Sequence, residues 1–256
     1  MSELIKPLRF LSLFAGIGGF DLGLERAEWQ CVGQVEVDSF CQKVLAKHWP
    51  NVWRWDDVRT VTGELIREHC GSVDAIVGGF PCQPHSLAGE QKAHLDERDL
   101  WPEYLRLVRE IKPRIIVGEN VAGLLSSDGG RFFGGILRDL AACGYDAEWN
   151  CFPAASIGSP HSRDRVWITA YPIGTGLQRF IFSGESLRGP AQKTSAQFGN
   201  RVISCGIHWA KDSPNLLLGN GVSARMARPV IKAYGNAVVP QVAEVVGRAI
   251  MESPNV

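Results

Sequence analysis

The stretch LRFLSLFAGIGGFDLGLERA, residues 8–27, combines a strand pattern, a glycine turn and a helix pattern. The apolar run Leu8 to Phe14 is typical of a buried strand, and Gly19 to Ala27 is typical of a helix. Three glycines lie at the junction: Gly16, Gly18 and Gly19. They permit a tight turn and a close approach of a ligand to the backbone. Such a strand–turn–helix unit is how an α/β domain begins.

The alternation of strand and helix patterns continues through the first two thirds of the chain. Further strands are expected at 31–37, 73–79, 114–120, 145–152 and 165–171. Helices are expected at 39–49, 100–111 and 130–144, and Gly144 should end the last of them. Strands that alternate with helices imply a parallel sheet covered on both faces. The predicted fold class is therefore α/β, with a doubly wound, mostly parallel, Rossmann-like sheet.

The pattern changes after residue 171. Residues 172–228 are rich in Gly, Ser, Pro and Asn and contain few apolar runs. The segment 236–251 then reads as an amphipathic helix, with an apolar face of Val242, Val245, Val246 and Ala249. We therefore expect a main domain formed by residues 1–171 and 229–256, with 172–228 as a small irregular insertion.

Charge is distributed unevenly, although the formal net charge of the chain is zero. Residues 171–233 contain eight Lys or Arg and only two Asp or Glu, so that stretch carries a net charge of +6. A basic segment beside an acidic body fits a localised contact with nucleic acid. A solvated loop region that happens to be basic explains the same charge equally well.

Cysteine usage and hydropathy exclude several classes of protein. The seven cysteines are odd in number and contain no C-x-x-C pair, which argues against a disulfide framework and against a zinc cluster. No apolar run approaches the roughly 20 residues that span a bilayer. The first ten residues do not read as a signal peptide. We expect a cytoplasmic protein with no bound metal and no membrane contact.

A nucleoside-binding site is predicted at the carboxyl ends of the first strands. Glu36 ends the second strand and follows Gly16 by 20 residues, the distance at which an acid typically hydrogen-bonds a ribose. Asp57 lies near the end of a third segment, where it could accept from an adenine amino group. The glycines do not match G-x-G-x-x-G, which favours a smaller nucleoside such as S-adenosylmethionine over a dinucleotide. A tight connection without a ligand is the alternative.

Three further stretches carry reactive groups, each at a predicted strand end. GFPCQ supplies Cys82, GENVAGLL supplies Glu119 and Asn120, and SPHSRDRVW supplies Arg163 and Arg165. The two arginines are two residues apart, so both point to one side if that segment is extended. Taken singly, these residues could be a buried thiol and a surface ion pair.

With these motifs the chain resembles the cytosine-5 DNA methyltransferases. FAGIGG, PCQ, ENV, RDR and YGNAVVPQ match the motifs of that family in the family's order. The resemblance covers nearly the whole chain except residues 172 to about 228. It implies transfer of a methyl group from S-adenosylmethionine to carbon-5 of cytosine. It makes 1–171 with 229–256 the catalytic, cofactor-binding domain, and 172–228 the target-recognition region.

The resemblance also implies a role for each catalytic candidate. Cys82 would add as a thiolate to carbon-6 of the ring, which makes carbon-5 nucleophilic. Glu119 would act at ring nitrogen 3, a role that suits a carboxyl group with a raised pKa. Arg165 would bind the base oxygen and Arg163 would brace the loop or its neighbours. The base that removes the carbon-5 proton is not assigned and can be water.

The implied cofactor site draws on the FAGIGG, PCQ and YGNAVVPQ motifs and on the two acidic positions between the first two of them. Its candidate residues are Phe14, Ala15, Gly16, Gly18, Gly19, Glu36, Val37, Asp57, Val58, Pro81, Asn236 and Val238. Asn236 could equally be only a helix N-cap. Residues 83–99 are polar and would form a loop that closes over DNA.

Two positions depart from the family. His161 stands where the arginine motif usually begins with glutamine, and His85 stands where the family often has an aromatic residue. His161 can still donate or accept a hydrogen bond, so we expect tuning of the activity rather than its loss, and His85 can fill a volume similar to that of an aromatic residue.

The implied partner is duplex DNA, from which the target cytosine must be flipped out. The candidate contacts in the target-recognition region are Arg179, Arg188, Arg201, His208 and Lys211. This region is short for the family. A cognate restriction endonuclease cannot be read from the sequence, and a monomer is the simplest expectation.

Three alternatives remain open at this point. An RNA cytosine-5 methyltransferase would use the same chemistry. A non-catalytic DNA-binding relative would keep the fold, although Cys82, Glu119 and Arg165 are all intact. A nicotinamide oxidoreductase is disfavoured by the glycine pattern.

Overall fold

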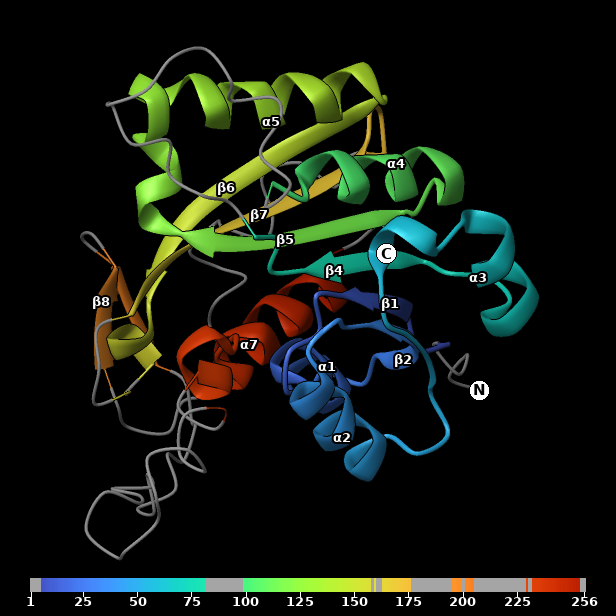
Figure 1. Ribbon diagram of the computed structural model, residues 1–256. Coiled ribbons are helices and arrows are strands. Elements are labelled where there is room, and N and C mark those ends of the chain that lie inside the picture. The colour runs from blue at the N-terminus through green and yellow to red at the C-terminus, as the bar shows by residue number, and fades with distance from the viewer. Residues whose placement is uncertain are drawn as a thin grey trace, which may run out of the picture.

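The computed structural model describes residues 6–81, 99–157, 159, 163–175, 229 and 232–253, and the backbone alone of 195–198 and 201–204. Its centre is a seven-stranded sheet with the strand order β3-β2-β1-β4-β5-β7-β6 (Figure 1). The strands are β1 (Arg9–Leu13), β2 (Gln30–Val35), β3 (Trp53–Trp55), β4 (Ala75–Gly78), β5 (Ile115–Val121), β6 (Tyr145–Pro153) and β7 (Asp164–Pro172).

The sheet is parallel from β3 to β5 and antiparallel at β7. β1 pairs in parallel with β2 and β4, and β3 and β5 extend the sheet in parallel on either side. β7 lies between β5 and β6 and is antiparallel to both. The prediction of a mostly parallel α/β sheet is confirmed. The position of β7 was not predicted, because strand order is set by tertiary packing and leaves no local pattern.

Helices cover both faces of the sheet (Figure 1). They are α1 (Gly19–Arg26), α2 (Ser39–His48), α3 (Gly63–Cys70), α4 (Trp101–Ile111), α5 (Arg131–Ala142) and α7 (Pro240–Met251). Short 3-10 segments are η1 (Val58–Thr60), η3 (Ala122–Leu125), η4 (Ser127–Gly130) and η5 (Ala154–Ile157). α1 and α7 pack on one face, and α3, α4 and α5 pack on the other.

Alternate strand residues feed the two cores, as the pleat of a strand requires. Phe10, Ala75 and Val77 join the core under α1 and α7. Leu11 and Ile76, which point the other way, join the core under α3, α4 and α5. Both faces of the central strands are therefore buried, which explains their continuous apolar runs.

Local sequence explains several helix ends. Asp38 caps α2 by accepting from the amides of Phe40 and Cys41. α5 ends at Ala142 and Gly144 follows with φ +85°, as its position in the sequence predicted. β3 and α3 were not predicted. β3 has only three residues, and α3, GELIREHC, is a short helix of eight residues that buries Gly63, Ile66 and Cys70.

The C-terminal helix α7 packs closely against α1. A Cβ built on Gly23 of α1 would lie 2.2 Å from the carbonyl oxygen of Pro240, and one on Gly247 would lie 2.7 Å from Cδ2 of Leu24. The helix α7 thus returns to the sheet that begins the chain. The two strands β8 (Ser195–Phe198) and β9 (Arg201–Ser204) form a separate antiparallel pair. The boundaries of the 172–228 insertion stay a prediction.

A search of the described residues for a helix long and apolar enough to span a membrane finds none.

Candidate functional site

The site lies along the edge of the sheet where the parallel strands end. Gly16 to Gly19 follow β1, Glu36 follows β2, and Gly79 to Pro81 follow β4. Glu119 lies near the end of β5. Because β7 is antiparallel to β5, its first residues lie at this same edge, with Arg165 paired to Val121. The antiparallel direction of β7 therefore places the arginine motif, at the start of that strand, beside Glu119.

The glycine turn has one glycine facing open space and two packed against other segments. Gly16 has φ +56°, and a Cβ there would meet nothing within 4 Å. A Cβ on Gly18 would lie 2.4 Å from the Trp49 ring, and one on Gly19 would lie 2.2 Å from the carbonyl oxygen of Val238. Side chains are thus excluded at Gly18 and Gly19 by packing. At Gly16 the turn leaves room for a ligand beside the backbone.

Gly16 and Glu36, predicted to share a ligand, are joined by a direct hydrogen bond. Glu36 accepts from the amide of Gly16 at 2.6 Å and from the amide of Asp38 at 2.7 Å. Burial raises the pKa of Glu36, and these amide donors oppose the rise. Val37 follows with 74% of its surface exposed, so an apolar side chain stands free next to the carboxylate. Phe14 and Ala15 lie in the same turn, Phe14 with φ +53°.

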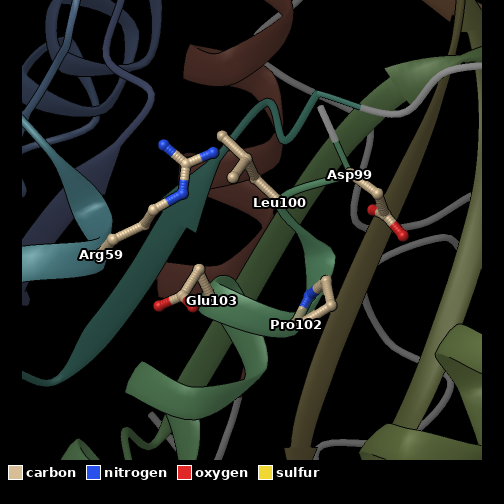
Figure 2. A pocket seen from close by; sticks show the side chains of 5 residues that line it. All are labelled: Arg59, Asp99, Leu100, Pro102 and Glu103. Carbon is tan, nitrogen blue, oxygen red and sulfur yellow. The ribbon is translucent and has the colours of Figure 1, made fainter. Parts of the chain in front are cut away.

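Asp57 caps η1 rather than standing free. Its Oδ1 accepts from the amide of Arg59 at 3.0 Å, and Val58 is buried beneath. A cavity of about 380 Å³ adjoins this segment, lined by Arg59, Asp99, Leu100, Pro102 and Glu103. Figure 2 shows Arg59 on one side of it, with Leu100, Pro102 and Glu103 around the start of α4. Of these residues the sequence singled out only Asp99, as the end of the predicted loop 83–99; the helix 100–111 was predicted, but no role in the site was predicted for its first residues.

Glu119 is a buried carboxyl group held against Arg165. The Nε of Arg165 lies 3.1 Å from Oε1 of Glu119. Burial raises the pKa of Glu119 to about 7, although Arg165 and Arg163 both lower it. Gly79 leaves room beside the carboxyl group, since a Cβ there would lie 3.1 Å from Oε2. A carboxyl group in this setting can hold or release a proton near neutral pH.

Arg163 is directed to the C-terminal part of the chain. Its Nη1 donates to the carbonyl oxygen of Gly235 at 2.8 Å, and its Nη2 donates to that of Ala237 at 2.6 Å. β7 begins at Asp164, and Arg163 has φ +36°, so the extended segment assumed for the two arginines stops between them. Both still lie close enough to Glu119 to lower its pKa.

Asn120 holds the backbone that leads to Cys82. Its Nδ2 donates to the carbonyl oxygen of Phe80 at 2.8 Å, and its Oδ1 accepts from the amide of Val121 at 2.8 Å. The carbonyl oxygen of Pro81 accepts from the amide of Leu100 at 3.4 Å. Asn120 was noted from its motif, but this role was not predicted.

The segment 235–238 contacts both halves of the site. The carbonyl oxygen of Val238 approaches Gly19, and Cγ2 of Val238 lies 3.6 Å from a Cβ built on Gly79. Asn236 is exposed within the same segment. Residues predicted at opposite ends of the sequence are thus brought together here.

Several predicted residues lie outside the part of the chain that the structure describes. They are Cys82, His85, His161, Arg179, Arg188, His208, Lys211 and the side chain of Arg201. The loop 83–99 is described only at Asp99. Within the described residues, no group of three or more His, Cys, Asp or Glu could hold a metal ion.

Comparison with known proteins yields one family and many relatives. The model of the C-5 cytosine-specific DNA methylase family matches residues 8–198. The type II methyltransferase M.HgiCII of Herpetosiphon aurantiacus is 36% identical over 70% of this chain and 40% of its own length. M.HhaI of Haemophilus parahaemolyticus, also a type II methyltransferase, is 32% identical over 70% of this chain and 53% of its own. The chain thus matches only about half, or less, of these relatives.

Solved structures show the same fold. A prophage-encoded protein of E. coli, described as a DNA modification methyltransferase, superposes with a TM-score of 0.59 at 25% identity. The match covers 70% of this chain and 50% of that one. DNMT2 of Spodoptera frugiperda gives a TM-score of 0.55 at 22% identity, over 64% of this chain and 50% of its own.

Proposed function

Because the chain belongs to the C-5 cytosine-specific DNA methylase family, we propose that it transfers a methyl group from S-adenosylmethionine to carbon-5 of cytosine in duplex DNA. The observation that carries this proposal is the buried Glu119, with a pKa of about 7, paired with Arg165. Both lie beside the strand end that leads to Cys82. An acid that is protonated near neutral pH is what addition of a thiolate to cytosine requires.

The residues after β1 and β2 fit the cofactor. Gly16 offers open space beside its backbone, and the exposed Val37 offers an apolar surface for a flat ring. Glu36 uses its two oxygens for one amide each, and a carboxylate has further lone pairs for hydroxyl donors. When bound, S-adenosylmethionine supplies an electrophilic methyl group on a sulfonium.

The other candidates surround this position. Phe14, Ala15, Gly18 and Gly19 shape the turn, and Asp57 with Val58 and the adjoining cavity would hold the far end of the nucleoside. Pro81, Asn236 and Val238 would close the side that faces the base. Val238 supports this assignment because a Cβ on Gly19 or on Gly79 would meet it, at 2.2 Å and 3.6 Å.

The reaction at the base begins with Cys82. Its thiolate forms a bond to carbon-6, and the electrons of the 5,6 double bond move toward nitrogen 3, where Glu119 delivers a proton. Arg165 donates to the base oxygen and orients the ring. Carbon-5 is then nucleophilic and would take the methyl group, with the sulfonium of the donor leaving as a neutral thioether. Glu119 would take back the proton from nitrogen 3, and loss of the carbon-5 proton to a base would expel the thiolate and restore the 5,6 double bond.

Target recognition belongs to residues 172–228. Their Lys and Arg side chains would contact phosphates and their remaining polar groups would read base edges. Flipping and transfer need one site, so we propose a monomer that acts in the cytoplasm on bacterial or phage DNA. A restriction endonuclease of the same specificity would be its partner in a type II system.

The test compares the wild type with Cys82→Ser, and with Cys143→Ser as a matched control. Cys143 is a half-buried thiol after α5, away from the site. Each protein is incubated with unmethylated duplex DNA and methyl-labelled S-adenosylmethionine, and the DNA is digested to nucleosides. We expect labelled 5-methylcytosine from the wild type and from Cys143→Ser, and none from Cys82→Ser.

Other outcomes would redirect the proposal. Label that enters transfer RNA but not DNA would identify an RNA methyltransferase. Binding of cofactor and DNA without any transfer would identify a binding protein. DNA that contains 5-fluorocytosine tests the covalent step separately, because fluorine cannot leave as a proton does. The wild type should remain attached to such DNA, and Cys82→Ser should not.

A further inference from the structure

A buried polar cluster lies beneath the glycine turn, formed by Asp21, Ser12, Cys31 and Gln34. Asp21 stands in the first turn of α1 and is fully buried, as are Ser12 of β1 and Gln34 of β2. Its carboxylate accepts from Ser12 Oγ at 3.0 Å, from Cys31 Sγ at 3.2 Å and from Gln34 Nε2 at 2.7 Å. Three donors on two neighbouring strands thus converge on one carboxylate.

The cluster continues to the third strand and back to the turn. The Oε1 of Gln34 accepts from Nε of Arg54 on β3 at 3.0 Å. Nη2 of Arg54 donates to the carbonyl oxygen of Trp49 at 2.6 Å. The Trp49 ring packs under Gly18, where a Cβ would lie 2.4 Å away. The chain of contacts therefore starts at α1 and ends under the turn that precedes α1.

Burial makes this arrangement costly. A carboxylate removed from water is stabilised only if donors replace its hydration, and an apolar side chain would fill the same space more cheaply. Burial indeed raises the pKa of Asp21, against the lowering effect of Gln34, Cys31 and Ser12. A buried carboxylate that destabilises this part of the described core is therefore expected to contribute something other than stability.

The cluster fixes the positions of two neighbouring groups, the glycine turn at Gly16 and the carboxylate of Glu36. Ser12 and Gln34 are register partners on β1 and β2, so Asp21 ties the first turn of α1 to both strands at one level. Glu36 follows Gln34 by two residues and accepts from the Gly16 amide. The cluster thus sets the distance between the glycine turn and the acid after β2.

We propose that Asp21 is a positioning residue for the cofactor site, which acts through Ser12 and Gln34 to hold the glycine turn and Glu36 in register. This inference rests on the proposed function, because it assumes that these two groups bind S-adenosylmethionine. Asp21 itself is too deeply buried to touch a ligand.

The direct test replaces the carboxylate by an amide of the same shape. Asp21→Asn keeps one oxygen as acceptor for Cys31 and Gln34 but presents an NH₂ group to Ser12, whose hydroxyl must change from donor to acceptor, and the charge of the carboxylate is lost from all three hydrogen bonds. We expect at least about a tenfold loss of affinity for S-adenosylmethionine, measured by calorimetry, from the loss of a charged hydrogen bond. Affinity for duplex DNA should change less than twofold.

A charge swap separates positioning from general damage. In Asp21→Asn with Gln34→Glu, the carboxylate introduced on β2 accepts from the amide introduced on α1 and from Arg54, so the connection is rebuilt with donor and acceptor exchanged. We expect the double variant to regain most of the lost affinity. Ser12→Ala, which removes only one donor, serves if Asp21→Asn does not fold, with a loss of a few-fold expected.

Tyr145→Phe is the control for lost stability alone. Its hydroxyl donates to the carbonyl oxygen of Pro113 at 2.8 Å. This hydrogen bond is buried, as those of Asp21 are, but it lies at the opposite edge of the sheet. This variant should melt lower and bind S-adenosylmethionine as the wild type does. Equal affinity in Asp21→Asn, or no recovery in the swap, would overturn the inference. Failure of the wild type to bind S-adenosylmethionine would instead reject the proposed function.

Discussion

Replacement of Glu119 by glutamine should make the protein more stable at alkaline pH while it removes the proposed proton donor. Burial raises the pKa of Glu119 from 4.5 to about 7. The folded state therefore favours the protonated acid, and its contribution to stability is complete below about pH 4.5. That contribution is lost as the pH rises through about 7, because the ionised carboxylate is then buried.

The size of the loss follows from the pKa values. At about 1.36 kcal/mol per pKa unit, the change from 4.5 to about 7 amounts to about 3 kcal/mol. Glutamine stays neutral at every pH and can still accept from Arg165. Glu119→Gln should therefore match the wild type near pH 4.5 and exceed it by up to about 3 kcal/mol at pH 8.

Urea unfolding of both proteins between pH 4.5 and 8 measures this difference. Methyl transfer is followed in the same buffers. We expect the two stability curves to diverge as the pH rises, and the activity of the wild type to fall above pH 7 as the acid loses its proton. Parallel stability curves would refute the reasoning, since they would mean that Glu119 titrates alike in the folded and unfolded chain.

Three further substitutions test the packing of the site. Gly19→Ala places a Cβ 2.2 Å from the carbonyl oxygen of Val238, so cofactor binding should fall sharply. Its control is Gly134→Ala, in open space on α5, which should stabilise the protein by about 0.5–1 kcal/mol in thermal unfolding. Asn120→Ala removes a donor from a buried carbonyl, at a cost of about 1–3 kcal/mol, and label transfer should slow while S-adenosylmethionine still binds in calorimetry. Arg163→Lys cannot reach both of its carbonyl partners, so the melting temperature and the cofactor affinity should fall together; unchanged values would show that the two hydrogen bonds contribute nothing.

The sequence predicted the parallel half of the sheet well. Its strands are buried on both faces and therefore read as apolar runs, and glycines mark the turn after β1 and the end of α5. β3 escaped because it is short and turns Arg54 toward the buried Gln34. The order of β6 and β7 could not be read, because it depends on contacts between residues far apart in sequence.

The site was predicted as a set of residues but not as a set of contacts. The spacing of Gly16 and Glu36 predicted a shared ligand, and the structure adds a hydrogen bond between the two. Asp57 was read as a ligand for adenine, and it caps η1. The cluster around Asp21 left no signal, since a polar residue in an amphipathic helix is ordinarily read as solvent-exposed.

The contacts of the segment 235–238 give a physical reason for keeping the two ends of the chain in one domain. Methyl transfer needs the cofactor and the base aligned to within a fraction of an ångström, and misplacement by about 1 Å can cost 100-fold in rate. Val238 lies next to Gly19 of the turn after β1 and near Gly79 after β4, while Arg163 binds the backbone on either side of Asn236. The sides proposed to hold the cofactor and the base are therefore braced against the same four residues. A shift on either side must move this segment or break its hydrogen bonds, so neither side can be displaced alone.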